Sequence, residues 1–295
     1  MIPNSTQDKL LVCFSWISAL LLTAGLTVVI GFLIVKGFPS LNTHLIFAGT
    51  SVQDAILLKR PVFGGLFPAM VGTFFLVLLS VGIALPLGLA TGIWLAEYAP
   101  PALKGIFSVI IDILAGIPSI VVGLFGFSIT IFLHHYYDDR IFPCLLISAL
   151  SLAFLVLPYI IKTTQGAIEN LPLHIRLTAP SLGASKLENI FYVLLPSALS
   201  DIVSGIVLAI GRCAEDTAVI MLTGVVATAG VPKSVFASFE ALPFYIYYIA
   251  SEYADHSELI NGYGAALILL SICTGLFVLA HIIKYWIDQK TRFRN

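Results

Sequence analysis

Three ionisable side chains, Arg212, Glu215 and Asp216, interrupt an apolar run that extends from about residue 202 to residue 226. Each charge at the centre of a membrane helix costs roughly 2.5 to 3.5 kcal/mol on insertion scales, so three together need a compensating interaction. Residues three and four apart on a helix have Cβ atoms roughly 5 to 6 Å apart, so Arg212 can reach both carboxylates. Two interpretations are open: a structural clasp in which the groups neutralise one another, or a station on a polar pathway.

The composition of the whole chain is that of a membrane protein with several spans. Of the 295 residues, 59% are hydrophobic and only 11% are charged, whereas a soluble domain has about 25% charged residues. The formal net charge of -1 offers no basic field to a nucleic acid, and the His and Cys residues have no metal-ligand spacing. We therefore expect no nucleic-acid partner and no metal, and we expect the four cysteines to be small buried hydrophobes rather than disulfide partners.

The elements that must position the cluster are transmembrane helices, each of which needs about 20 predominantly apolar residues. The hydropathy pattern predicts an all-α polytopic fold, with one transmembrane domain over residues 1–295. The first apolar run is too long for the core of a signal peptide, so we expect it to stay as an anchor. The six predicted spans are approximately 11–35, 66–94, 106–133, 141–161, 199–228 and 260–286.

The distribution of Lys and Arg predicts that both termini lie in the cytoplasm, because cytoplasmic loops of membrane proteins carry an excess of basic residues. The basic C-terminal stretch "KYWIDQKTRFRN" decides this orientation. The cytoplasmic segments then contain Lys9, Lys104, Lys162, Arg176, Lys186, Lys284, Lys290, Arg292 and Arg294, against Lys36, Lys59, Arg60, Arg140 and Lys233 outside.

The predicted cytoplasmic segment 162–198 is the most unusual connection in the chain. It is amphipathic and punctuated by Pro and Gly, unlike a simple polar linker. Short helices at the membrane surface are indicated by apolar residues at roughly helical spacing, namely Leu182, Leu187, Ile190, Phe191 and Leu194. Such helices can dock a partner protein, or they can merely close the helical bundle.

The part of this segment that reads "RLTAPSLGASKLENIFYVLLP" resembles the signature of ABC importer permeases. That signature has Glu-Ala-Ala, three residues, Gly, about nine residues, and then an apolar residue followed by Leu-Pro. Gly183 matches its glycine, and Leu195 and Pro196 match its final pair. The Glu-Ala-Ala triplet falls on Leu177, Thr178 and Ala179, so this chain lacks the signature glutamate.

Further stretches narrow the resemblance to the A-type permeases of bacterial phosphate importers, the PstA family. Three of them are "GGLFPAMVGTFFLVLLSVGIALPLGLATGIWLAEYAP", "LAGIPSIVVGLFG" and "ALPFYIYYIASE". The charged stretch "GRCAEDTA" is similar to the fifth-span pattern of that family, which is Arg, two residues and Gly-Glu-Thr-Ala. Glu215 stands in place of the glycine of this pattern, and Asp216 stands in place of its glutamate.

The resemblance implies a type I ABC importer permease (MetI-like) fold in the bacterial cytoplasmic (inner) membrane. The implied partners are a C-type permease subunit, two ATPase subunits, an extracytoplasmic phosphate-binding protein, inorganic phosphate and membrane lipid. The chain itself would be no enzyme and would bind no cofactor, with ATP and Mg²⁺ on the partner ATPases. In agreement, the sequence has no Walker A pattern of phosphate-cradling glycines and Lys.

The same resemblance implies roles for the residues that it covers. Arg212, Glu215 and Asp216 would line the substrate pathway, with Arg212 contacting the anion through its fork of donors and Asp216 holding Arg212 at rest. For Glu215 a second interpretation is open, contact with a partner helix, because the matching position of the family is glycine. Phosphate near neutral pH keeps a proton that it can donate to the carboxylate of Asp216, whereas sulfate only accepts hydrogen bonds. A lever that couples to the ATPase is predicted at Thr178, Ala179, Ser181, Leu182, Gly183, Ala184, Ser185 and Leu187.

Other classes of protein are less consistent with these residues. A permease for another oxyanion or small solute remains an alternative, and only the phosphate-type stretches quoted above distinguish it from a phosphate permease. An intramembrane enzyme would need a Ser-His or Asp-Asp constellation in facing spans, which the sequence lacks. A passive channel would have no need of a segment that docks an ATPase.

Weaker polar features have simpler interpretations. Asp112 is expected to be a satisfied interfacial carboxylate, and the adjacent His134 and His135 make a poor metal site without further ligands. The aromatic stretch "FYIYYI" is typical of an interfacial belt. Small residues at helical spacing permit close backbone approach, either between permease subunits or within the bundle: Gly116, Ser119, Gly123 and Gly126.

Overall fold

The computed structural model describes residues 6–56, 62 and 64–292 of the chain, and its elements confirm the predicted all-α class. Lys59, Arg60 and Arg294, which the orientation argument uses, lie outside the described residues. Six helical segments in the described part are long and apolar enough to cross a membrane: Asp8–Ser40, Phe67–Glu97, Ser119–Tyr136, Leu145–Glu169, Lys186–Glu215 and His256–Trp286.

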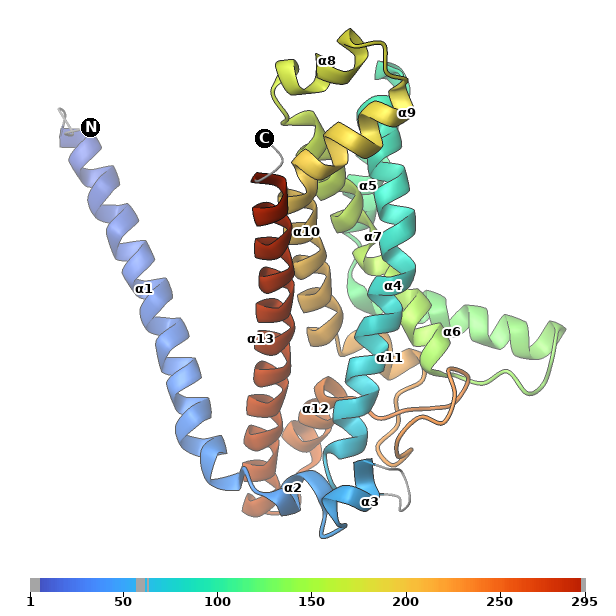
Figure 1. Ribbon diagram of the computed structural model, residues 1–295. Coiled ribbons are helices and arrows are strands. Elements are labelled where there is room, and N and C mark those ends of the chain that lie inside the picture. The colour runs from blue at the N-terminus through green and yellow to red at the C-terminus, as the bar shows by residue number, and fades with distance from the viewer. Residues whose placement is uncertain (1–5, 57–61, 63, 293–295) are drawn as a thin grey trace.

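Four long helices lie side by side and form the bundle (Figure 1). They are α4 (Phe67–Glu97), α7 (Leu145–Glu169), α10 (Leu195–Glu215) and α13 (His256–Arg292). The most extensive contact joins α4 to α7, where Gly88 faces Ile160 and Gly92 faces Thr164. A Cβ atom on Gly92 would lie only 2.6 Å from the Cβ of Thr164, so these glycines let the two backbones approach closely.

The first helix, α1 (Thr6–Gly37), leans away from this bundle (Figure 1). It contacts α13 near one of its ends, where the rings of Phe32 and Tyr263 meet edge to face at 5.6 Å between centroids. Nearly all of its other apolar side chains are exposed, including Cys13, which is therefore not the buried cysteine that the sequence predicts.

The predicted span 106–133 is not a single helix. It is divided into α5 (Pro101–Ala115) and α6 (Ser119–Tyr136), because Pro118 lacks a backbone N–H and disfavours the helical conformation of the residue before it. Helix α6 projects sideways from the bundle in Figure 1.

The predicted span 199–228 is also interrupted, since α10 ends at Glu215 and a short helix α11 (Ala218–Thr223) follows. The backbone leaves the helical conformation at Asp216, where ψ is 118°. Helix α11 packs against α6 and α7. The small residues of α6 serve this packing: a Cβ atom on Gly123 would lie 3.0 Å from the Cα of Val219, and Gly126 faces Ser151.

The bundle has two distinct ends (Figure 1). One end carries α8 (Leu173–Ser181), α9 (Lys186–Asn189) and a π-helical turn (Ile190–Leu194), together with the start of α1 and the end of α13. We call it the α8 end. The short elements toward the opposite end are a 3₁₀ turn (Phe38–Ser40), α2 (Thr43–Phe47), α3 (Val52–Ile56) and α12 (Leu242–Glu252).

Candidate functional site

The charged cluster lies where α10 stops, about halfway along α13 (Figure 1). Gly211, next to Arg212, approaches the ring of Phe277 in α13, so that a Cβ atom on this glycine would lie 2.9 Å from the ring. The helix break therefore places Arg212 in the interior of the bundle's length and not at a membrane surface. A chain that ends a helix at this depth must provide partners for the freed backbone groups.

Arg212 pairs with both acids, but unequally. Its Nη1 atom donates to Glu215 Oε1 at 2.8 Å, whereas its Nη2 atom lies 3.7 Å from Asp216 Oδ2. The Glu215 side chain is 64% exposed and that of Asp216 only 3%. The closer partner of Arg212 is thus Glu215, and not Asp216 as the sequence predicts.

Asp216 also has a structural role, which its position in the sequence does not indicate. Its Oδ1 atom accepts a hydrogen bond from the backbone N–H of Val219 at 2.8 Å, in the first turn of α11. An Asp side chain that satisfies such an orphan N–H stabilises the start of a helix. Arg212 therefore reaches both carboxylates, as the spacing predicts, although Asp216 lies beyond the end of α10.

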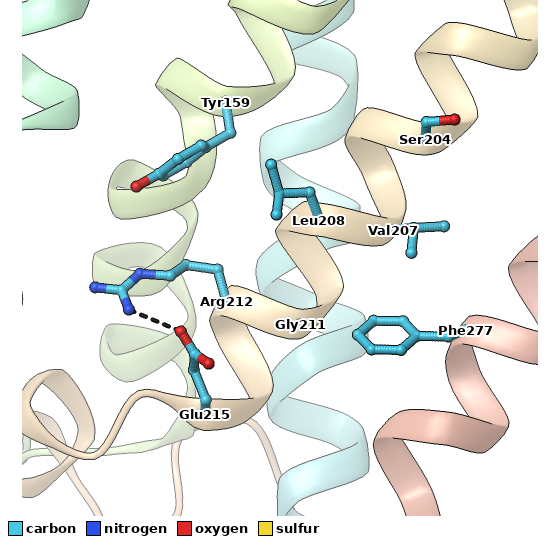
Figure 2. Close-up of a pocket in the computed structure, with 8 residues that line it drawn as sticks. All are labelled: Tyr159, Ser204, Val207, Leu208, Gly211, Arg212, Glu215 and Phe277. Atoms are coloured by element: carbon cyan, nitrogen blue, oxygen red, sulfur yellow. Dashed lines mark hydrogen bonds and ion pairs between the residues drawn. The ribbon is translucent and has the colours of Figure 1, made fainter. Parts of the chain in front are cut away.

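An open cavity of about 610 Å³ adjoins the pair formed by Arg212 and Glu215. Figure 2 shows its lining from three helices, with Tyr159 from α7, Phe277 from α13 and the remaining residues from α10. Tyr159 and Ser204 contribute hydroxyl groups to the same cavity as the guanidinium. The other lining residues of α10 are apolar or glycine, namely Val207, Leu208 and Gly211.

The exposed face of α10 extends this polar character along the helix. Asp201, Ser204, Leu208 and Glu215 are exposed, and they recur with Arg212 at intervals of three or four residues, which places them on one face. The opposite face is buried in the bundle, for example at Ala209 and Cys213. Charged side chains are not stable against lipid, so this exposed face requires water or another protein chain beside it.

Arg212 has donors to spare. Its Nε atom is buried and has no hydrogen-bond partner among the described residues. A guanidinium offers five N–H donors in a planar fork, which matches the oxygens of a carboxylate or a phosphate. The arrangement can therefore recognise a small oxyanion, with Glu215 as the resting partner of Arg212.

The predicted coupling residues lie together at the α8 end, around the junction of α8 and α9. Gly183 has a φ of +85°, in the left-handed region that favours glycine, and it makes the turn between the two helices. Ser185 and Glu188 form a capping box that starts α9. Most of the predicted residues are exposed, namely Thr178, Ser181, Leu182, Gly183, Ser185 and Leu187, whereas Ala179 and Ala184 are half-buried.

This junction is fastened to the end of α4. Arg176 Nη2 lies 2.6 Å from Glu97 Oε1, and the Asn189 side chain donates to the backbone oxygen of Arg176 at 3.0 Å. Lys186 donates to the backbone oxygen of Glu97 and lies over the ring of Tyr98, 4.5 Å from its centroid. Leu182 lies beyond these contacts and is 85% exposed. The turn between α8 and α9 therefore forms an exposed apolar tip, whose flanking residues are fixed to α4.

The weaker features of the sequence have local roles. Asp112 pairs with Lys162 at 2.9 Å, and His134 shares a hydrogen bond with the backbone oxygen of Ile141 at 3.0 Å. No group of three or more metal-ligating side chains occurs within the described ranges. The aromatic stretch forms much of α12, in which Phe244 and Tyr248 stack at 6.3 Å between ring centroids.

Comparison with known proteins now decides the family. Residues 88–293 match the family described as "Binding-protein-dependent transport system inner membrane component". The phosphate transport system permease protein PstA of Haemophilus influenzae is 29% identical over 93% of this chain and 93% of its own length. PstA 1 of Mycobacterium tuberculosis is 30% identical over 78% of this chain and 72% of its own length. The chain belongs to the PstA family of binding-protein-dependent transport permeases.

The fold of this permease is that of solved ABC importers. A chain of the MetNI methionine ABC transporter superposes with a TM-score of 0.54 at 20% identity, covering 83% of this chain and 100% of that chain. A chain of a bacterial alginate ABC transporter superposes with a TM-score of 0.56 at 17% identity. The match covers 92% of this chain and 94% of that chain. These likenesses confirm the predicted type I importer (MetI-like) fold and carry no information on substrate.

Family membership also settles the general class of the protein. It is a multi-pass inner-membrane subunit of an ABC transporter and not an enzyme, since ATP hydrolysis belongs to separate ATPase subunits. An ATPase and a binding protein are accordingly its partners.

Proposed function

We propose that this permease forms half of the membrane pathway of an ATP-driven importer of inorganic phosphate. A C-type permease subunit supplies the other half, two ATPase subunits bind ATP and Mg²⁺, and an extracytoplasmic protein delivers the phosphate. The α8 end, with both termini, faces the cytoplasm, and lipid surrounds the assembled pair of permeases. Names of relatives such as PstA of Haemophilus influenzae support the substrate.

The observation that carries the proposal is the pair formed by Arg212 and Glu215 on the wall of an open cavity, deep within the length of the bundle. Phosphate enters this cavity and takes the place of Glu215 as the acceptor for the guanidinium fork, since both present oxygens in a matching geometry. The hydroxyl of Tyr159 is available to the same anion. Asp216 stays behind the guanidinium, where it caps α11 and stabilises the cation.

Discrimination between phosphate and sulfate follows from the proton that phosphate retains near neutral pH. A phosphate hydroxyl donates a hydrogen bond to the released Glu215 carboxylate, whereas sulfate has no proton and is repelled by it. A site built to accept a donated hydrogen bond rejects an analogue that lacks the donor.

Coupling to ATP hydrolysis takes place at the α8 end. The exposed tip between Thr178 and Leu187 docks on the ATPase, and ATPase closure moves this tip. The pair formed by Arg176 and Glu97 passes the movement to α4, which packs against α7 and α10. The pathway then alternates between outward and inward access, because each ATPase state favours one arrangement of the permeases.

The test is labelled phosphate uptake, with labelled sulfate as a control, in proteoliposomes that contain the complete complex. Arg212→Gln should lower phosphate uptake about a hundred-fold, since it removes the charged donor that holds the anion and a hydrogen bond to a charged group contributes about 1.5 to 3 kcal/mol. Arg212→Lys keeps the charge but loses the fork, and should recover part of the uptake. Copurification of the ATPase reports assembly for each variant.

Normal uptake by Arg212→Gln would make the cluster a structural clasp and would contradict its place on the pathway. An absence of phosphate uptake in the wild-type complex would contradict the substrate itself. Uptake of sulfate at the same rate as phosphate would contradict the proposed exclusion of sulfate by Glu215. The protein would then be a permease for oxyanions in general.

A further inference from the structure

A second cavity, of about 490 Å³, lies between α10 and α13. It shares Ser204, Val207 and Phe277 with the cavity beside Arg212, so the two cavities adjoin along α10, and we call them together the groove. The second cavity adds Lys284, His281 and Thr274 from α13. Lys284 is the lining residue of α13 nearest to the α8 end, and Thr274 is the farthest from it.

Lys284 is held by a hydroxyl group. Its Nζ atom donates to Ser204 Oγ at 3.0 Å. Two other lysines pair with carboxylates, Lys104 with Glu169 at 2.7 Å and Lys162 with Asp112 at 2.9 Å, whereas no carboxylate of the described residues forms an ion pair with Lys284. A neutral hydroxyl leaves the charge of the ammonium group uncompensated by that contact, and such a cation attracts an anion.

The position of Ser204 on α10 places Lys284 between Arg212 and the α8 end. Ser204 precedes Arg212 by eight residues, which corresponds to about 12 Å along a helix axis. Both residues belong to the exposed face of α10, and Asp201 continues that face one turn closer to the α8 end. An anion that leaves Arg212 toward the α8 end therefore meets Ser204 and Lys284 next.

We propose that Lys284 and Ser204 form a second binding station for inorganic phosphate, on the exit side of Arg212. The proposal rests on the proposed function and adds the next step of the same pathway. At rest the Ser204 hydroxyl accepts from Lys284 and donates to the backbone oxygen of Ser200 at 3.0 Å. It turns from that oxygen to donate to a phosphate oxygen while the ammonium group supplies the charge. An ammonium group is a compact and strongly hydrated charge, unlike the rigid fork of Arg, so it suits an anion that is regaining its water.

The experiment measures the concentration dependence of phosphate uptake by the complete complex in proteoliposomes. Lys284→Gln should lower the maximal rate about ten-fold, as expected for the loss of a charged hydrogen-bond donor, with little change in KM. Lys284→Arg should restore most of the rate, and Ser204→Ala should lower it about three-fold. Lys104→Gln is the matched control, because it removes a lysine from the same end of the bundle outside the groove.

Three outcomes would overturn the station. They are an unchanged rate in Lys284→Gln, an equal loss in Lys104→Gln, and a loss that Lys284→Arg does not restore although the complex assembles. Arg212→Gln, measured in parallel, separates the two proposals. Loss of uptake in Arg212→Gln with a normal rate in Lys284→Gln refutes only the second station, whereas normal uptake in Arg212→Gln refutes the pathway on which both depend.

Discussion

Two pairs of Arg and Glu, similar in length, differ in their surroundings, and we propose different roles for them in this permease. Arg212 and Glu215 are three residues apart on α10 and lie 2.8 Å apart, whereas Arg176 and Glu97 join α8 to α4 at 2.6 Å. The Glu215 side chain is 64% exposed and that of Glu97 only 11%. A local, open pair can exchange its carboxylate for a passing anion without moving a helix. A half-buried pair between distant segments is less open to exchange, and it is suited to transmitting movement.

The largest effect is expected from removing the tie between α8 and α4. Glu97→Ala should lower phosphate uptake per ATP hydrolysed about ten-fold, equivalent to roughly 1.4 kcal/mol of coupling. Lys186 contacts only the backbone oxygen of Glu97, so that contact survives the substitution. The measurement is simultaneous uptake and ATP hydrolysis in proteoliposomes, with ATPase copurification as the check on assembly.

The charge-swapped double variant, Glu97→Arg with Arg176→Glu, provides the control for this prediction. It restores an ion pair between the same two segments and should recover much of the coupling. If uptake and ATP hydrolysis fell in equal proportion in Glu97→Ala, the pair would have no role in transmission.

An intermediate effect is expected at the open pair. Glu215→Gln keeps an acceptor for Arg212 but replaces a charge with an amide that also donates hydrogen bonds. Phosphate uptake should fall only about three-fold, while sulfate should begin to inhibit it, since the repulsion that excludes sulfate is gone. Competition of sulfate with labelled phosphate tests this, with Glu252→Gln on the exposed part of α12 as control. Continued exclusion of sulfate would show that another group discriminates.

The smallest effect is expected at Asp216, which the structure separates from the open pair. Asp216→Ala removes the cap of α11 and should destabilise the permease by about 1 kcal/mol. Asp216→Asn keeps an oxygen for the Val219 N–H and should be close to the wild type in thermal unfolding of the purified complex. Equal destabilisation by both changes would indicate that the charge facing Arg212, and not the cap, is what matters.

The sequence predicts the long helices and the charged cluster well, because apolar length and ionisable residues inside it are local signals. The breaks are harder to predict, since hydropathy continues across Asp216 and across Gly116 to Pro118. Both carry a signal in retrospect: an Asp before Thr-Ala-Val is typical of a helix start, and Pro118 favours a boundary.

The partners of the cluster lie beyond such local reasoning. Ser204 shares the spacing of Arg212 and Glu215 on α10, so an inspection of that face for polar residues identifies it. Tyr159, Phe277 and Lys284 reach the groove only because α7 and α13 pack beside α10. The tie between Arg176 and Glu97 spans 79 residues, a separation at which the sequence holds no indication of contact.

If the cluster binds phosphate as proposed, the end of α10 at Glu215 also limits how long the anion stays. The last carbonyl groups of a helix carry a partial negative charge, and here they lie in the same turn as Arg212. With one cation, two carboxylates and these carbonyls, the empty cluster is electronegative on balance. An arriving anion is oriented by the guanidinium but held weakly, and a conducting site needs this short residence to release its substrate.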